Sequence, residues 1–169
     1  MHKWYSDEEG MISPSLFALE ELRNVKLVLL TFISRMYELI REAVGDMKDS
    51  TGRIPGCGEY FVTEEGLGAF CLSIGAPASA MALETLIASG VNKFVICGEA
   101  GSLTPLLKVG DLFIPVFAVR EEGVSYHYLP PEVVPKPDEG LKARLVKILR
   151  DGGLDPKLGG VWTTDAPFR

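Results

Sequence analysis

Two short apolar runs, residues 26–32 (KLVLLTF) and residues 93–97 (KFVIC), constrain the fold of this chain more than any other feature. An apolar run without alternation is typical of a strand that is buried on both faces, as the strands of parallel sheets are. Helical patterns lie beside both runs, over residues 34–44 after the first and residues 78–89 before the second. This alternation predicts an α/β fold of three layers, in which helices cover both faces of a central sheet that is mostly parallel or mixed.

The rest of the chain extends the same pattern. Its 169 residues suit one domain, and we expect a single domain over residues 1–169. In open α/β sheets ligands bind beyond the carboxyl ends of the strands, so the loops after Leu30, Ile74 and Cys97 are the candidate ligand-binding loops. The further elements that the patterns predict are helices at 14–23 and 141–150, strands at 60–63, 69–74, 112–119 and 160–164, and a polar loop at 46–58.

Charge and cysteine content narrow the class of function. A net charge of −6 argues against nucleic acid or an anionic membrane as a partner, and the longest apolar stretch, residues 25–33, is too short to span a bilayer. No cysteine or histidine spacing suggests a metal site. Cys71 and Cys97 lie in apolar runs, so we expect them to be buried, inert thiols of a protein in a reducing, cytoplasmic compartment.

A loop of small residues, GEAG at 98–101, directly follows the second apolar run. Its glycines permit positive φ and close backbone approach, so several N–H groups can point at an anion or a polar ring. From the glycine spacing alone, a tight turn that only redirects the chain is the preferred interpretation. The loop is neither a P-loop nor a G-x-G-x-x-G motif.

Three stretches taken in order resemble the nucleoside phosphorylase family: GAPASAMALETLIASGVNKFVICGEAGSL, VGDLFIPVFAVREEGVSYHY and GVWTTDAPF. That family includes purine nucleoside phosphorylase, uridine phosphorylase and the adenosylhomocysteine nucleosidases. The resemblance implies a pentosyltransferase that cleaves the N-glycosidic bond of a purine or pyrimidine nucleoside with phosphate. It also implies a homo-oligomer that needs no cofactor, with inorganic phosphate as its co-substrate. The alternatives are a hydrolytic nucleosidase and an inactive nucleoside-binding or assembly module.

For phosphate, the resemblance implies binding by Arg35, Arg53, Gly98 and Glu99. Arginine suits this role because its guanidinium makes charge-assisted, bidentate contacts. Each charged candidate also has an ordinary interpretation: Arg35 as a solvated helix residue, Arg53 as a surface loop residue, and Glu99 as the ion-pair partner of Arg35. Two departures from the family pattern argue against phosphorolysis as the reaction. Ile96 stands where the phosphorylases have an arginine, and Glu99 stands where they have Ser or Thr.

For the nucleoside, the resemblance implies a second set of residues from three parts of the chain. Phe168 suits stacking on the planar base, although at a chain terminus it is prone to disorder. The set comprises Gly75, Ala100, Gly101, Thr164, Asp165 and Phe168.

The family's ribose-binding Glu-Met-Glu motif and its acid for the purine ring follow later in its members than the last motif found here. We therefore expect a C-terminally shortened member of the family that lacks the usual hydroxyl acceptors and proton donor. A shortened sheet also exposes an edge that can pair with another chain.

Overall fold

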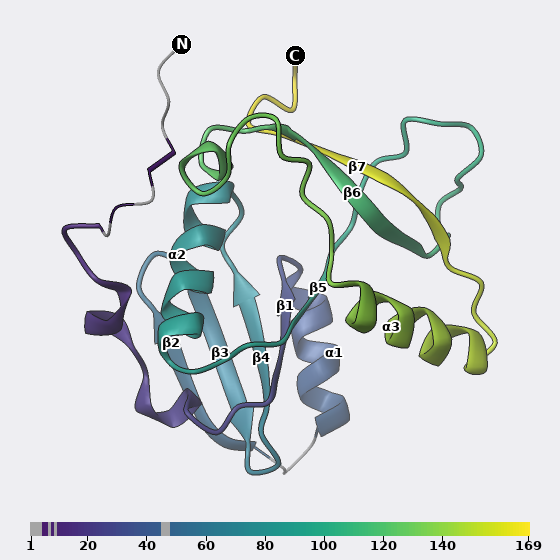
Figure 1. Cartoon of the computed structure of the whole chain (residues 1–169). Helices are drawn as coiled ribbons and strands as arrows, with labels where there is room; N and C mark the ends of the chain where they lie inside the picture. The colour runs from purple at the N-terminus through teal and green to yellow at the C-terminus, as the bar shows by residue number, and fades with distance from the viewer. Residues whose placement is uncertain (1–4, 7, 9, 45–47) are drawn as a thin grey trace. The chain divides into compact units, whose positions relative to one another are not determined.

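The structure is a computed structural model that describes residues 5–6, 8, 10–44 and 48–169 (Figure 1). The chain divides into two compact units, each with its own contacts. Residues 7–100 form one, called here the N-terminal unit, and residues 101–169 with residues 5 and 6 form the other, the C-terminal unit.

The N-terminal unit is built on a five-stranded mixed sheet with the strand order β2-β3-β4-β1-β5. The central strand β1 runs parallel to β4 on one side and to β5 on the other. Strand β3 is antiparallel to β4, and β2 is antiparallel to β3. The strands are β1 (Leu27–Thr31), β2 (Lys48–Ile54), β3 (Gly58–Thr63), β4 (Leu67–Leu72) and β5 (Phe94–Cys97).

Two helices, α1 (Ser34–Val44) and α2 (Ala76–Ala88), cover opposite faces of this sheet. Consecutive residues of a strand point to opposite faces, so one strand supplies two cores. Phe70 of β4 joins the cluster that contains Leu86 of α2, whereas Ala69 joins the cluster that contains Tyr37 of α1. The predicted α/β fold, with three layers and a mixed sheet, is confirmed.

The two apolar runs and the helical patterns beside them form the expected elements, but the expected burial of the second run is wrong: no residue of β5 (Phe94–Cys97) is fully buried, and Ile96 is 59% exposed. The helix predicted at 34–44 is α1, and the runs at 26–32 and 93–97 contain β1 and β5. Helix α2 begins two residues earlier than predicted because a proline, Pro77, is tolerated in a first turn, where its missing N–H has no partner to lose. Gly75 precedes it at φ +121, a conformation that favours glycine.

The C-terminal unit contains a parallel pair of strands, β6 (Phe113–Glu121) and β7 (Lys157–Thr164). Between them in the chain lie a short 3-10 helix, η3 (Ser125–His127), and the helix α3 (Glu139–Asp151). The side chain of Asp138 caps α3 by accepting a hydrogen bond from the Leu141 N–H at 2.7 Å. The cap satisfies one of the donors that a helix start leaves unpaired.

Two predicted elements are wrong. Residues 14–23 form two 3-10 helices, η1 (Pro14–Phe17) and η2 (Glu20–Leu22), with an extended break between them. Tertiary contacts override the helical pattern there, because Leu22 is fully buried in the core and the Leu19 N–H donates to Ser89 Oγ at 2.8 Å.

The predicted polar loop is the second wrong element, since its residues 48–54 form β2, while 46 and 47 lie outside the described residues. Strand β2 is an outer strand of the sheet and, within the part of the chain that the structure describes, pairs with β3 alone, so it tolerates a polar sequence.

The expectation for the thiols is also corrected. Cys97 is exposed and Cys71 is half-buried, because their strands reach the open end of the sheet at these residues. Cys57 is the buried thiol of the chain, and burial raises its pKa.

Candidate active site

Three parallel strands of the N-terminal unit end at the same level. Thr31, at the end of β1, lies in register with Cys71 of β4 on one side and with Cys97 of β5 on the other. The loops that follow these strands therefore start from one edge of the sheet, called here the carboxyl edge. In open α/β sheets this edge is the place where ligands bind.

The antiparallel strands bring two more chain segments to the carboxyl edge. Gly58, the start of β3, pairs with Leu72 of β4, and Ile54, the end of β2, pairs with Gly58. Arg53 thus lies at the same edge, in register with Glu59 of β3. All four phosphate candidates, Arg35, Arg53, Gly98 and Glu99, belong to the N-terminal unit and to this edge.

The loop after β5 is open rather than packed. Gly98, Glu99 and Ala100 are all exposed and have no regular secondary structure. A Cβ atom built at Gly98 would meet only the ring of Phe32, at an ordinary contact distance of 3.9 Å. Neither Gly98 nor Gly101 has positive φ, so these glycines leave space and do not serve to permit a left-handed turn.

Glu99 does not form the ion pair that its ordinary interpretation requires. Arg35, in the first turn of α1, pairs instead with Glu42 at 3.2 Å, and both side chains are mostly exposed. Among the residues that the structure describes, Glu99 has no hydrogen bond or ion pair. The carboxylate is therefore solvated and available to a ligand.

The loop after β4 has a well-defined backbone. The Ser73 N–H donates to the Cys57 carbonyl at 2.6 Å, which ties this loop to the start of β3. The Ser79 N–H and hydroxyl both donate to the Gly75 carbonyl, at 3.1 and 2.9 Å. Gly75 is thereby held at the start of α2 with its carbonyl directed to the helix.

The remaining nucleoside candidates, apart from Ala100, belong to the C-terminal unit. Gly101 is exposed, and no atom lies within 4 Å of a Cβ built there. Thr164 and Asp165 form a turn at the end of β7: Thr164 Oγ1 accepts from the Ala166 N–H at 3.0 Å, and Asp165 Oδ2 accepts from the Gly123 N–H at 3.2 Å. Phe168 is 98% exposed, so its ring is not used in packing.

A hydrogen-bonded cluster in the C-terminal unit escaped prediction. The Arg120 guanidinium, on β6, donates to Ser125 Oγ and to the carbonyls of Leu129, Pro130 and Val133 at 2.8–3.1 Å. It also lies 4.1 Å from the ring centre of Tyr126. The whole guanidinium is thus used to hold the loop that contains η3, which is a structural role.

Glu122 completes this cluster. It is 8% exposed and accepts from the Val124 and Ser125 N–H groups at 2.8 and 2.9 Å and from the Ser125 hydroxyl. Burial acts to raise the pKa of Glu122, but hydrogen bonds from Ser125 and Val124 and the charge of Arg120 outweigh it and lower the pKa. The signal in the sequence was the spacing R-x-E-x-x-S, which places a donor near the end of β6 and an acceptor and a hydroxyl in the segment that follows.

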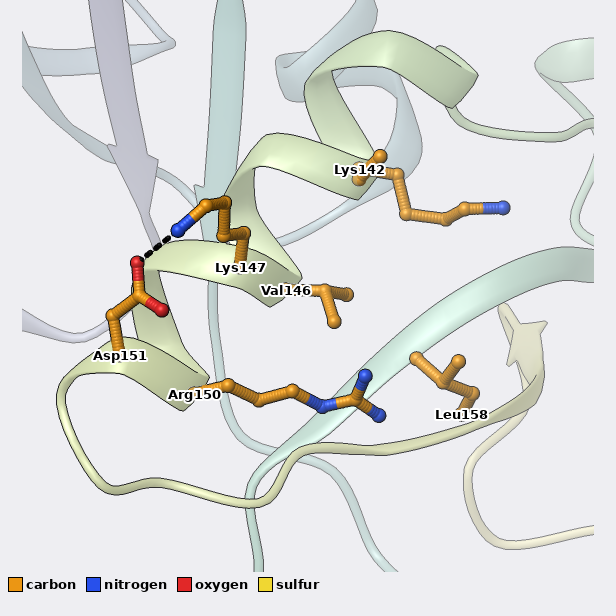
Figure 2. Close-up of a pocket in the computed structure, with 7 residues that line it drawn as sticks. Lys142, Val146, Lys147, Arg150, Asp151 and Leu158 are labelled. Carbon is orange, nitrogen blue, oxygen red and sulfur yellow. Dashed lines mark hydrogen bonds and ion pairs between the residues drawn. The ribbon is translucent and has the colours of Figure 1, made fainter.

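A groove of about 500 Å³ lies in the C-terminal unit between α3 and the start of β7 (Figure 2). Lys147 forms an ion pair with Asp151 at 2.5 Å, and Lys142 pairs with Glu139 at 2.5 Å. None of the predicted site residues lines this groove, and two of its cations are already neutralised. The groove is lined by Lys142, Ala143, Val146, Lys147, Arg150, Asp151 and Leu158.

The described part of the chain has neither a metal-binding cluster nor a membrane-spanning helix. No three His, Cys, Asp or Glu side chains there are grouped so that they could hold a metal ion. No helix among these residues is both long and apolar enough to cross a membrane.

The fold and the open carboxyl edge define an α/β protein with a candidate small-molecule site at the ends of parallel strands. A model of the phosphorylase superfamily matches residues 27–169. The chain therefore belongs to the phosphorylase superfamily, and the resemblance carried by its sequence motifs is confirmed.

Relatives of this chain carry names from the same superfamily. A uridine phosphorylase of Thermococcus kodakarensis is 33% identical over 136 residues, which are 79% of this chain and 46% of that protein. A guanosine phosphorylase of Halorubrum lacusprofundi is 34% identical over 93 residues, or 55% of this chain and 39% of that protein. The chain thus spans less than half the length of these relatives.

Solved structures with the same fold include a purine nucleoside phosphorylase from Toxoplasma gondii in complex with immucillin-H. Its TM-score is 0.79 at 21% identity, and the match covers 96% of this chain and 66% of that one. An AMP nucleosidase from Bacteroides thetaiotaomicron has a TM-score of 0.78 at 24% identity, with 88% and 64% coverage. At these identities the likeness defines the fold.

Proposed function

We propose that this protein cleaves the N-glycosidic bond of a purine or pyrimidine nucleoside and transfers the pentosyl group to an acceptor. The observation that carries the proposal is the open loop of Gly98, Glu99 and Ala100 at the carboxyl edge of a phosphorylase-superfamily sheet. Inorganic phosphate is the acceptor that the names of the relatives favour. Water is the alternative acceptor, favoured by the unpaired carboxylate of Glu99.

In the proposed reaction the bond between C1′ and the base nitrogen breaks, and its electron pair leaves with the base. An acceptor oxygen forms the new bond to C1′, and the base takes up a proton. Backbone N–H groups of residues 98–100 and of Gly75 bind the nucleoside in this proposal. Gly101, Thr164, Asp165 and Phe168 of the C-terminal unit are proposed as further nucleoside-binding residues on the family resemblance.

Phosphate, where it is the acceptor, is held in this proposal by Arg35 and the loop after β5. Arg53, on β2 four strands from β5, lies at the same edge but does not contact the same anion. Arg35 is available because an exposed ion pair such as that with Glu42 contributes at most about 1 kcal/mol, so an arriving anion displaces it at little cost. No cofactor takes part. We further propose a cytoplasmic homo-oligomer, in which the outer strand β5, paired among the described residues with β1 alone, is covered in the assembly.

The test is a product assay. Inosine, adenosine and uridine are incubated with the protein, with and without phosphate, and free base is separated by chromatography. Release of base supports the proposal, and the phosphate dependence identifies the acceptor. Nucleoside binding by calorimetry without any base release would instead support an inactive nucleoside-binding module.

A further inference from the structure

We infer that Glu99 determines the acceptor: its carboxylate repels phosphate from the loop after β5 and accepts a proton from an attacking water. This inference rests on the proposed cleavage of a nucleoside and deepens it, since it names the residue that selects hydrolysis. It starts from the position of Glu99, two residues beyond β5 at the carboxyl edge.

The charges around Glu99 are the first argument. Arg35 reaches the same edge from α1 but pairs with Glu42 at 3.2 Å, so these three residues together carry one net negative charge. Arg53 lies on β2, four strands from β5 in the sheet order. At about 4.8 Å per strand this separation is about 19 Å, more than twice the Debye length of about 8 Å at physiological salt.

The loop after β4 adds no charge to balance Glu99, because residues 73–75 are Ser, Ile and Gly. Within the described part of the N-terminal unit, the loops after β4 and β5 thus offer phosphate a carboxylate and no unpaired cation. Two like charges about 4 Å apart repel each other even in full solvent, and the repulsion doubles for a dianion. We expect this repulsion to weaken phosphate binding by about tenfold or more.

The same carboxylate suits a neutral acceptor. Glu99 is exposed and has no partner among the described residues, so both its oxygens can accept hydrogen bonds from water. In the hydrolytic step one water proton passes to Glu99 while the water oxygen bonds to C1′. The electron pair of the C1′–N bond leaves with the base, which takes a proton from solvent, and Glu99 then returns its proton to solvent. The products are a free pentose and a free base.

The experiment compares the unchanged protein with two variants, Glu99→Gln and Glu64→Gln. Glutamine keeps the size of the side chain and removes its charge. Glu64 is the matched control, because it is an exposed carboxylate in the β3–β4 turn, at the opposite edge of the same sheet. Circular dichroism checks that all three proteins are folded, inorganic phosphate is titrated by calorimetry, and base release is measured with and without phosphate.

We expect Glu99→Gln to bind phosphate about tenfold more tightly than the unchanged protein and Glu64→Gln to differ by less than twofold. Base release by the unchanged protein should proceed without phosphate and fall by about a hundredfold in Glu99→Gln, as expected for loss of a general base. Equal phosphate affinities in the unchanged protein and Glu99→Gln, or base release that requires phosphate, would overturn the inference.

If the proposed function itself is wrong, the assays give a result that differs from failure of the Glu99 inference alone. If no protein releases base under any condition, nucleoside cleavage and the proton-accepting role of Glu99 are both overturned. The phosphate affinities still decide whether Glu99 repels an anion at this edge.

Discussion

Substitution of Leu86 by alanine should lower the free energy of unfolding of the N-terminal unit, because this residue packs α2 against the sheet. Leu86 is fully buried and belongs to the cluster that contains Val28 and Leu30 of β1 and Phe70 of β4. Loss of three buried carbon groups, at about 0.8 kcal/mol each, removes about 2.4 kcal/mol of transfer free energy. The cavity that remains adds to this cost, which gives a range of about 2–5 kcal/mol.

Hydrogen exchange measured by mass spectrometry is the suitable assay, because it reports each unit separately. Amides of β1 (Leu27–Thr31) and β4 (Leu67–Leu72) should exchange about fiftyfold faster or more in Leu86→Ala, since 1.4 kcal/mol corresponds to a factor of ten.

Met81→Ala is the control on the same helix. Met81 is 55% exposed, so its truncation should change the free energy of opening by less than about 1 kcal/mol. If both variants raise exchange in β1 and β4 by the same factor, Leu86 is not a core contact and the reasoning about α2 fails.

Three further predictions concern a cap, a pH dependence and the thiols. Asp138→Ala should destabilise α3 by about 0.5–2 kcal/mol, whereas Asp138→Asn should cost much less, as amide exchange over residues 139–151 will show. The hydrogen bond from Tyr60 lowers the pKa of Glu21 in the folded protein. This hydrogen bond therefore stabilises the fold fully above the pKa that Glu21 has in the unfolded chain, and the stabilisation is lost as the pH falls through the lower pKa of Glu21 in the folded protein. The stability difference between the unchanged protein and Tyr60→Phe should therefore be largest at neutral pH and shrink in acid, and a constant difference in denaturation from pH 7 to 3 would contradict this. An alkylating reagent should modify exposed Cys97 rapidly and buried Cys57 only on unfolding, with mass spectrometry locating the label.

The central layer of the fold was predictable because its signals are local. The run over residues 26–32 is apolar without alternation, which is typical of a strand covered on both faces, and α1 carries its apolar side chains on one face. These patterns place the carboxyl edge, and with it the loop after β5, before any coordinates are known.

The elements that escaped prediction depend on partners distant in the sequence. Residues 14–23 have a helical pattern, but Leu19 binds Ser89 and Leu22 enters the core, which no local pattern reveals. Strand β2 has a polar sequence without a local strand pattern and forms because its backbone pairs with β3.

For the site, residue types indicated which groups reach the carboxyl edge but not how they pair. Arg35 and Glu99 looked like natural partners because both follow parallel strands. In the structure the helical geometry of α1 gives Arg35 a closer carboxylate in Glu42, seven residues along the same helix. Pairing of exposed side chains is decided by small energies, which sequence spacing does not resolve.

The most direct measurement of the central claim is hydrogen exchange of the protein with and without a saturating nucleoside. Binding at the carboxyl edge predicts that inosine, adenosine or uridine slows exchange in the loop at 98–101 and in the loop at 73–75, while the β3–β4 turn at 64–66 stays unchanged. Slower exchange confined to that turn or to the groove between α3 and β7, or no change at saturating concentrations of all three nucleosides, would contradict the account.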